Sequence, residues 1–509
     1  MLVAEKNLLK SYSVAALLPW AIVGLYIIVA LAAMNYHEPW GDEIHSWNIA
    51  KGSGSFADLM SNIRYEGHPP VWYSILWIIS KFTHNLAYVQ IVHLIIAILT
   101  IFIIVFFSPV PLSTRILIPF GYYFVFEYAV ISRNYAVGVL LAFCICAIIR
   151  KNFRYKNVLY YLLLFLLTNT HLLAILLAAA LHFYFLVLQA EWKQKRSIIV
   201  LHALLGLLAA LPSLYFIFPP SDSQLNVQFW LNHWDVHHLT AFGQAPLFAF
   251  LPIPAWWHYQ SWNTQFLIEA KSSLSVLRPI NLLIAATLPL LAVVVLIKNK
   301  KATLVFLINF FLSFLIAVAV FPMTAERYAG FIFIGFVVAY WLYCSETLVT
   351  PGVKSLVNGF LIIQLLGSAF IIPKDIQHSF SNAYRVNELL KEVPPGEQTV
   401  TDYWAMNTIS AFTDNSFYCI DLQKQISFIQ WNSDLGAMQK RRYRYYEGVT
   451  SFFQRNNVNR LYMISTGSPK VLFKVDSALF KSYHVTLSDK REGAIEKGGN
   501  IYLYRISSL

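Results

Sequence analysis

The sequence predicts a mainly α-helical, polytopic transmembrane protein with about eleven spans and a small C-terminal α/β domain. Three observations predict this class. Of the 509 residues, 57% are hydrophobic and only 13% are charged, whereas soluble globular chains are about 45–50% apolar and about 25% charged. The mean hydropathy is +0.55. This composition excludes a soluble enzyme, a disordered chain and a fibrous repeat.

Eleven apolar runs are long enough, or nearly long enough, to cross a bilayer as helices. They lie at 14–33, 86–107, 114–131, 135–149, 157–170, 172–190, 198–218, 279–297, 302–321, 328–344 and 356–372. The first run is not followed by a small-residue cleavage site, so we interpret it as an anchor and not as a removed signal peptide. A shorter run at 69–79 predicts a helix at the membrane interface.

Lysine and arginine residues predict the orientation of the spans. With a cytoplasmic N-terminus, the basic clusters at 150–156, 193–196 and 298–301 all fall in short inner loops, as the positive-inside rule requires. We therefore attribute the net charge of +12 to topology and expect no nucleic-acid partner. The sequence predicts a multi-pass protein of the cytoplasmic (inner) membrane.

The chain is expected to form two domains, a transmembrane catalytic domain at 1–373 and a soluble domain at 374–509. The tail contains no run of spanning length. It alternates between expected helices and strands, which favours a small α/β domain. An odd number of spans places this tail outside the cytoplasm, in the periplasm. The expected helices are 383–393 and 447–456, and the expected strands are 399–402, 417–421, 460–465, 484–488 and 500–506.

Two adjacent carboxylates, Asp42 and Glu43, lie in the first outer segment, just after the first span. The stretch Glu66-Gly67-His68-Pro69-Pro70 follows them. A carboxylate in such a place can act as a general base on an acceptor hydroxyl. The alternatives are structural: Asp42 is also a good N-cap for an interfacial helix, and Glu43 would suit the helix dipole.

More polar residues open later spans on the same predicted side: Arg133, Tyr135, His171, Arg327 and Tyr328. Each alone could be an interfacial anchor. Basic residues at the outer membrane boundary are, however, contrary to the positive-inside rule. Polar residues at the level of the membrane are candidate functional residues. Arginines can hold a phosphate and stabilise it as it leaves. No Gly-rich phosphate loop is visible, which agrees with a lipid-phosphate donor in place of a nucleotide.

The second outer segment, 219–278, is rich in aromatic residues. These side chains can stack on sugar rings, although some of them are expected to form a plain interfacial belt. The candidates are Trp230, Trp234, Trp256, Trp257, Tyr259 and Trp262.

Taken in order, four motifs resemble the GT-C superfamily of polytopic membrane glycosyltransferases. They are Asp42-Glu43, Gly67-His68-Pro69-Pro70-Val71-Trp72-Tyr73, Ser132-Arg133-Asn134-Tyr135-Ala136 and Glu326-Arg327-Tyr328. The chain is most similar to the branch that contains protein O-mannosyltransferases and the aminoarabinose transferase of lipid A. The resemblance covers roughly residues 14–345.

This resemblance implies inverting transfer of a sugar from a polyprenyl-phosphate donor to a lipid, glycan or protein acceptor on the periplasmic face. By analogy Asp42 is the catalytic base, with Glu43 beside it as the second catalytic candidate. Arg133 and Arg327 would contact the carrier phosphate, and His68 would help to shape the site. Tyr135, His171 and Tyr328 complete the candidate substrate-binding set.

Oligosaccharyltransferase relatives in this superfamily hold a metal with further acidic residues, and no second acidic pair lies near Arg133 in this sequence. From this resemblance we expect no obligatory metal or other cofactor. A divalent site built from His45, His68, Glu43 and Glu66 is the alternative. Two other functions stay open. One is a transporter or flippase of lipid-linked glycans, which would need charges along a midplane path. The other is an outer-face ligase or polymerase of the O-antigen type.

Overall fold

The computed structural model describes residues 2–223, 236–271, 277–321, 323–413, 416–435 and 445–509. The chain divides into two compact units, which we describe separately. Unit 1 comprises Met1–Tyr36, Gln90–Leu214 and Phe229–Lys374, and unit 2 comprises His37–Val89, Tyr215–Gln228 and Asp375–Leu509.

The last segment of unit 2 begins at Asp375, and the expected C-terminal domain begins at residue 374. The first outer segment also belongs to unit 2. Residues 37–89 lie within the expected transmembrane domain in the sequence, and in the structure they form one compact unit with the C-terminal segment. The two candidate carboxylates therefore belong to the same unit as the α/β fold.

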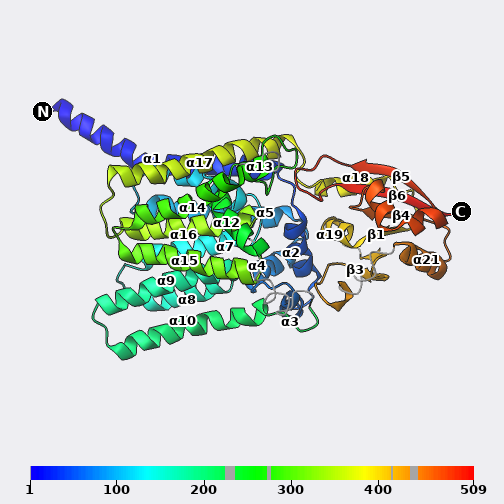
Figure 1. The fold of residues 1–509 in the computed structure, drawn as a ribbon, viewed down its shortest axis with the longest axis horizontal. Coiled ribbons are helices and arrows are strands. Elements are labelled where there is room, and N and C mark those ends of the chain that lie inside the picture. Colours follow the sequence, from blue (N-terminus) through cyan, green and yellow to red (C-terminus); the bar gives the residue numbers. More distant parts are fainter. Residues whose placement is uncertain (1, 224–235, 272–276, 322, 414–415, 436–444) are drawn as a thin grey trace. The chain divides into compact units, whose positions relative to one another are not determined.

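Unit 1 is a bundle of helices that run roughly side by side (Figure 1). Its helices are α1 (Leu2–Tyr36), α5 (Ala87–Phe107), α6 (Leu112–Leu117), α7 (Tyr135–Ile148), α8 (Lys156–Thr168), α9 (Leu172–Glu191), α10 (Arg196–Ile217), α12 (Val236–Phe250), α13 (Phe266–Lys271), α14 (Leu277–Leu296), α15 (Lys300–Ala319), α16 (Glu326–Cys344) and α17 (Pro351–Gln377). Eight of the described helices are long and apolar enough to cross a membrane, namely α1, α5, α9, α10, α14, α15, α16 and α17. The chain is thus a multi-pass membrane protein in its composition and helix lengths.

Burial differs strongly among these eight helices. In α16, 83% of the most apolar stretch is buried inside the protein, whereas in α10 the share is 22%. Leucines along α10, such as Leu207 and Leu211, are more than half exposed. A helix that is apolar all round and exposed needs lipid to cover it. Helix α16 is therefore the centre of the bundle and α10 lies at its lipid-facing edge.

Three of the eleven expected spans are shorter or broken. The run 135–149 forms the 14-residue helix α7, and 157–170 forms the 13-residue helix α8. The run 114–131 is not one helix: α6 gives way to the 3₁₀ turn η2 (Ile118–Phe120) and the π-helix η3 (Tyr123–Glu127). The break has a cause, because Pro119 lacks the backbone N–H that continues a helix.

Helix α12 was not expected, because its residues fall in the segment 219–278 that the sequence analysis placed outside the membrane. Its second half is buried, with Ala245, Leu247 and Phe250 fully enclosed. It packs against α14, α15 and α16. Pro246 lies inside this helix and Gly243 approaches the Leu282 side chain of α14. A 15-residue apolar helix between turn-forming residues gives a weak hydropathy signal.

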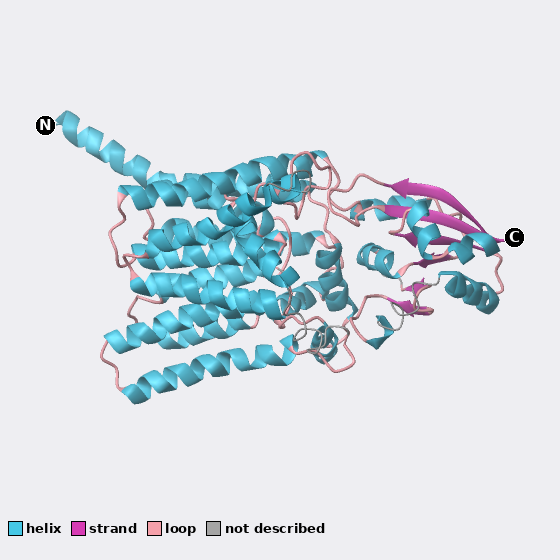
Figure 2. Ribbon diagram, in the orientation of Figure 1, coloured by secondary structure: helices cyan, strands magenta, loops and turns pink. Residues whose placement is uncertain are grey.

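Unit 2 contains a six-stranded sheet in the order β3-β2-β1-β4-β6-β5 (Figures 1 and 2). The strands are β1 (Thr399–Thr401), β2 (Phe417–Cys419), β3 (Lys424–Ile426), β4 (Arg460–Ser465), β5 (Tyr483–Arg491) and β6 (Ile501–Ser508). Strand β1 is parallel to β2 and β4, and the other neighbours are antiparallel. The predicted small α/β domain is confirmed, with β3 as an additional strand.

Both faces of this sheet are covered. On β4, Leu461 and Met463 enter one apolar core and Tyr462 and Ile464 enter another, as the alternation of side chains along a strand requires. The helices of the C-terminal segment are η4 (Ala383–Arg385), α18 (Val386–Lys391), α19 (Tyr403–Phe412), α21 (Tyr445–Asn456), α22 (Pro469–Val475) and α23 (Ser477–Ser482). Helix α19 was missed, because its residues follow directly on a strand.

The first outer segment adds a second helical layer to unit 2. It forms α2 (Gly41–Gly52), α3 (Phe56–Asn62), the 3₁₀ turn η1 (Ile63–Tyr65) and α4 (Val71–Ser80). Helix α2 packs against both α4 and α19. The Lys51 ammonium donates to the carbonyl oxygens of Ser410 and Thr413, at 2.6 and 2.9 Å. A cation at the C-terminus of α19 complements the helix dipole and fixes α2 against this helix.

Candidate functional site

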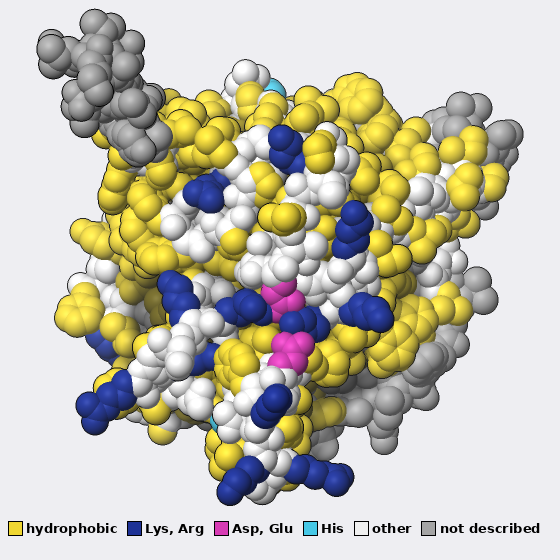
Figure 3. Space-filling model, turned by 90° about the vertical axis from the view of Figure 1, so that its left-hand side faces the viewer, with side chains coloured by type: hydrophobic (Ala, Val, Ile, Leu, Met, Phe, Trp, Pro, Cys, Tyr) yellow, Lys and Arg dark blue, Asp and Glu magenta, His cyan; other side chains and the backbone are white. Residues whose placement is uncertain are grey.

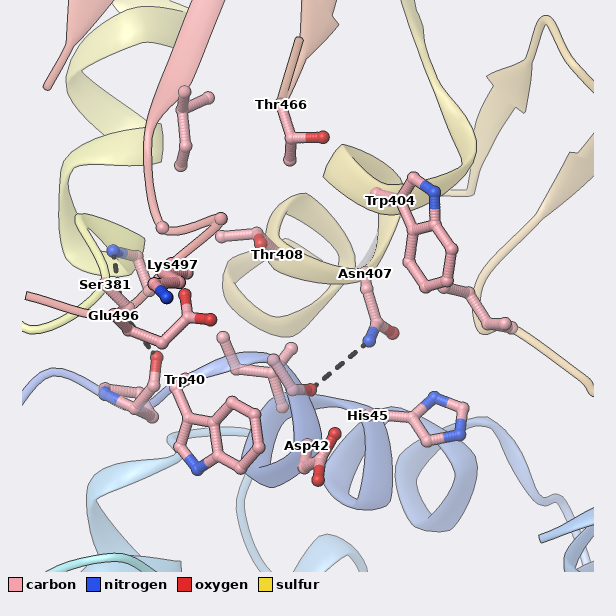
Figure 4. Close-up of a pocket in the computed structure, with 18 of the residues that line it drawn as sticks. Trp40, Asp42, His45, Ser381, Trp404, Asn407, Thr408, Thr466, Glu496 and Lys497 are labelled. Carbon is pink, nitrogen blue, oxygen red and sulfur yellow. Dashed lines mark hydrogen bonds between the residues drawn. The ribbon is translucent and has the colours of Figure 1, made fainter. Parts of the chain in front are cut away.

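A pocket of about 270 Å³ lies inside unit 2, between α2 and α19 (Figure 4). Asp42 and His45 of α2 form one side of it, and Trp404, Asn407 and Thr408 of α19 form the other. Figure 4 shows Asp42 between Trp40 and His45, with Asn407 across from it. The amide of Asn407 donates to the carbonyl oxygen of Gly41 at 3.4 Å. One predicted site residue, Asp42, therefore lines a formed cavity.

The two adjacent carboxylates have different surroundings. Helix α2 begins at Gly41 with Trp40 as its N-cap residue, so Asp42 is not the N-cap. Glu43 takes the capping role, since its carboxylate accepts the backbone N–H of Trp40 at 3.0 Å. Glu43 is 3% exposed and does not line the pocket, whereas Asp42 is half-buried and does. The structural alternative thus holds for Glu43, and Asp42 is the better placed of the two for chemistry.

Glu43 also belongs to a buried ionic cluster at the base of α2. The imidazole of His37 lies 3.2 Å from Glu43 and 2.9 Å from Asp375. All three side chains are almost fully buried. Burial alone would lower the pKa of His37, but the negative charges of Asp375 and Glu43 outweigh it and raise this pKa to about 10. His37 is therefore a cation at neutral pH and connects α2 to the start of the C-terminal segment.

We expect His37→Ala to lower the free energy of unfolding of unit 2 by about 3–5 kcal/mol, because it leaves two buried carboxylates without their shared cation. The measurement is thermal or urea unfolding of the purified protein, followed by tryptophan fluorescence. His484→Ala is the matched control, since His484 is an exposed histidine of the same unit. Equal stability of the two variants would show that the cluster does not hold unit 2 together.

The same cluster predicts a pH dependence. The pKa of His37 is raised in the folded state, to about 10, above the value near 6.5 of an unfolded chain. The stabilising contribution is therefore complete below about pH 6.5 and is lost as the pH rises towards 10. We expect the melting temperature of the wild type to fall over this range more steeply than that of His37→Ala. Parallel curves for the two proteins would contradict the assignment.

His45 is held in place by a second carboxylate. Its Nε2 atom lies 2.8 Å from Glu66, which also accepts from the Tyr73 hydroxyl at 3.4 Å. Asp42 and His45 are three positions apart, so they share one face of α2. Gly67 follows with φ of +64°, a conformation that residues with a side chain rarely adopt. The turn at Gly67 follows Glu66, which contacts His45. His68 comes after the turn, is half-buried and does not line the pocket.

Aromatic side chains form much of the pocket wall. Trp40, Trp404 and Trp431 line it together with the hydroxyl and amide side chains of Thr408, Thr466 and Asn407. Sites for small organic ligands commonly combine apolar or aromatic walls with a few polar groups that fix orientation. Glu496 and Lys497 also line the pocket. Aromatic walls with charged and neutral polar groups suit a hydroxyl-bearing ligand such as a sugar.

The other predicted site residues lie in unit 1, where the structure brings them together. The rings of Tyr135 and His171 are 4.8 Å apart, and those of Tyr135 and Tyr328 are 6.3 Å apart. The guanidinium of Arg327 lies over the Tyr328 ring at 4.6 Å. Arg133 precedes Tyr135 by two positions and is 6% exposed. Side chains from three separate segments thus lie close together, namely Tyr135, His171, and Arg327 with Tyr328. With Arg133, which is near Tyr135 in the sequence, we call these residues the arginine–tyrosine cluster (Arg133, Tyr135, His171, Arg327 and Tyr328).

Three helices begin at this cluster, and this explains the convergence. Tyr135 is the first residue of α7, His171 is the N-cap of α9, and Arg327 is the second residue of α16. These helices pack against one another. A Cβ atom at Gly138 of α7 would lie 2.7 Å from His171, so the close approach depends on a glycine. Helix N-termini attract anions and disfavour cations, so two arginines there suit an anionic ligand.

The aromatic residues of the second outer segment have mixed placements. Trp256, Trp257 and Tyr259 are about half exposed. Trp262 is buried and donates to Glu127 at 3.2 Å, so it is a structural residue and not a stacking surface. Trp230 and Trp234 lie outside the described residues.

The C-terminal half of the pocket was not predicted from the sequence. Trp404, Asn407, Thr408 and Trp431 carry no motif, and they lie more than 350 positions from Asp42. The ionic contact between His37 and Asp375 was not predicted either. Within the described part of the chain, no three His, Cys, Asp or Glu side chains gather as a metal site.

Comparison with known proteins adds no family to this description. The sequence matches no protein-family model, and no curated protein is significantly similar to it.

Proposed function

We propose that this protein is a membrane glycosyltransferase of the GT-C type. It transfers a sugar, with inversion, from a polyprenyl-phosphate donor to an acceptor hydroxyl at the outer face of the cytoplasmic membrane. The observation that carries this proposal is the pocket in which the Asp42 carboxylate lies among Trp40, Trp404 and Trp431. A base and sugar-stacking surfaces are what an acceptor site needs.

The reaction assigns separate roles to the two groups of residues. Asp42 accepts the proton of the acceptor hydroxyl. The acceptor oxygen then forms a bond to the anomeric carbon as the bond from that carbon to the phosphate oxygen breaks. A single displacement of this kind inverts the configuration, and polyprenyl phosphate leaves with its electron pair. The resemblance to GT-C enzymes assigns Arg133 and Arg327 to the carrier phosphate, whose developing negative charge guanidinium groups stabilise.

The charge distribution of unit 1 supports the proposed orientation. Basic side chains gather on the face of the molecule that Figure 3 shows. Arg150 follows the end of α7, and Lys156 and Lys300 are the first residues of α8 and α15. The arginine–tyrosine cluster lies at the other end of α7 and α9. If the basic end is cytoplasmic, as the positive-inside rule predicts, the cluster faces the periplasm.

The proposal is tested with purified full-length protein and a panel of radiolabelled polyprenyl-phosphate sugars, offered with membrane lipid, glycan and peptide acceptors. We expect one donor to be consumed, with release of polyprenyl phosphate and label in the acceptor fraction. Nucleotide sugars should give no transfer. Movement of a lipid-linked glycan across proteoliposome membranes without any transfer would contradict the proposal and favour a flippase.

The orientation gives a separate prediction. Single cysteines at Ser221 and Lys298, both exposed, are introduced after the four natural cysteines have been replaced. A membrane-impermeant thiol reagent should label Ser221→Cys in intact spheroplasts. Lys298→Cys should react only after the membrane is permeabilised, because its basic loop is cytoplasmic. The reverse pattern would place the arginine–tyrosine cluster on the cytoplasmic side and refute the outer-face reaction.

A further inference from the structure

The basic end of unit 1 contains a pocket of about 590 Å³ (Figure 3 shows this end). It lies where α7 ends, α8 begins and α9 ends, so it is at the opposite end of α7 and α9 from the arginine–tyrosine cluster. Three cations line it, Arg150, Arg154 and Lys156. The rest of the wall is mostly uncharged, with amides such as Gln189 and the indole of Trp192.

Lys156 is the unusual member of this set. Its side chain is 6% exposed, and no described residue accepts a hydrogen bond from its buried Nζ atom. The ammonium lies over the faces of two aromatic rings, those of Trp192 and Phe185, at 4.1 and 5.8 Å from the ring centres. A buried ammonium is strongly disfavoured unless it is paired with an anion and hydrogen-bonded.

The acidic residues nearby do not supply that anion. Glu346 pairs with Arg150 and with Lys301, the second of these at 2.8 Å. Glu191 pairs with Lys301 at 3.0 Å. Among the described residues, neither Arg154 nor Lys156 forms an ion pair. The pocket therefore has a net positive charge with a buried ammonium in its wall.

We propose that this pocket binds a phosphate group, with Lys156 as the buried ligand and Arg154 as the ligand at the rim. Guanidinium and ammonium groups are the usual partners of phosphate oxygens. The headgroup of an anionic phospholipid is one source of that phosphate, and basic pockets between helices at the cytoplasmic side bind such headgroups. Val158, at the edge of the pocket, is 69% exposed and would contact the acyl chains. Free phosphate in solution is the other source.

The test uses the delipidated full-length protein in a zwitterionic detergent, and it measures the melting temperature during titration. The probes are phosphatidylglycerol, phosphatidylcholine and inorganic phosphate. We expect phosphatidylglycerol to raise the melting temperature and phosphatidylcholine to have a much smaller effect. Lys156→Gln should raise the concentration of phosphatidylglycerol at half effect by at least about tenfold, because a charge-assisted hydrogen bond is lost.

Lys354→Gln is the matched control, because Lys354 is an exposed lysine at the start of α17 and does not line the pocket. Its titration should follow the wild type. If Lys156→Gln does not fold, the same titration is carried out with Arg154→Gln. Arg154 is exposed, so its substitution leaves no cavity in the core.

The outcomes separate the two sources of phosphate. A Lys156-dependent effect of phosphatidylglycerol alone supports a lipid headgroup, and an equal effect of inorganic phosphate supports a soluble ligand. The proposal is overturned if neither probe stabilises the protein, or if the pocket variants and Lys354→Gln respond alike.

Discussion

Asp42→Asn should reduce sugar transfer by about 10²–10⁴-fold, the usual effect of losing a general base. The substitution keeps the size of the side chain and its place in the pocket, so donor binding and the melting temperature should stay near those of the wild type. The measurement is the initial rate of transfer from the polyprenyl-phosphate donor, at equal amounts of folded protein. A rate near that of the wild type would remove Asp42 from the mechanism.

Glu43→Gln is the matched comparison, because it changes the neighbouring carboxylate in the same helical turn. Glu43 contacts His37 and the Trp40 backbone and does not line the pocket. We therefore expect Glu43→Gln to lower the melting temperature more than it lowers the rate per folded molecule. The opposite pattern, with Asp42→Asn active and Glu43→Gln inactive but stable, would exchange the roles of the two residues.

A second comparison tests the pocket wall. Trp404→Ala should weaken the use of the acceptor, seen as a raised KM for the acceptor with little change for the donor. Trp404 is 40% exposed, so its removal leaves no large cavity in the core. An effect on the donor alone would mean that the aromatic wall serves the sugar–phosphate and not the acceptor.

The parts of the fold that hydropathy describes could be predicted from the sequence. Long apolar helices such as α9 and α15 produce a strong signal, and so does the buried strand β4. The run 114–131 was not divided correctly, because it was treated as one span although Pro119, Gly121 and Glu127 lie inside it, and the path of the chain after the turn at Pro119 depends on packing. Gly121 at this turn lies against Gln364 of α17, a contact between residues far apart in the sequence.

The candidate site residues also divide into those that have a local sequence signal and those that depend on tertiary packing. Tyr135, His171 and Tyr328 were predicted as substrate-binding residues because they lie at span ends that the Lys/Arg distribution places on the outer side. The pocket around Asp42 was only half predicted. Its other half comes from α19, and no local pattern connects Trp404 or Asn407 with α2. Such a pairing is set by tertiary packing alone.

Arg133→Lys and Arg327→Lys should each reduce turnover by about 10²-fold, near the lower end of the effect of removing one donor to a developing negative charge. Lysine keeps the positive charge but cannot bind a phosphate with two parallel hydrogen bonds. The loss should therefore appear in the rate and in its dependence on donor concentration, while the melting temperature changes little. The interfacial-anchor alternative predicts unchanged rates, because lysine reaches the membrane surface as well as arginine does.

Arg115→Lys controls for a general effect of exchanging an arginine in unit 1. The Arg115 guanidinium donates to the carbonyl oxygens of Ser108 and Val110, at 3.0 and 3.1 Å, so its role is to close a turn. We expect this variant to have the wild-type rate. If Arg133→Lys and Arg327→Lys also had the wild-type rate, both arginines would be interpreted as interfacial anchors. A negative charge that develops in a low-dielectric site needs a fixed cation near it. Without Arg133 and Arg327 in this role, the proposed reaction would have no group that stabilises the leaving phosphate.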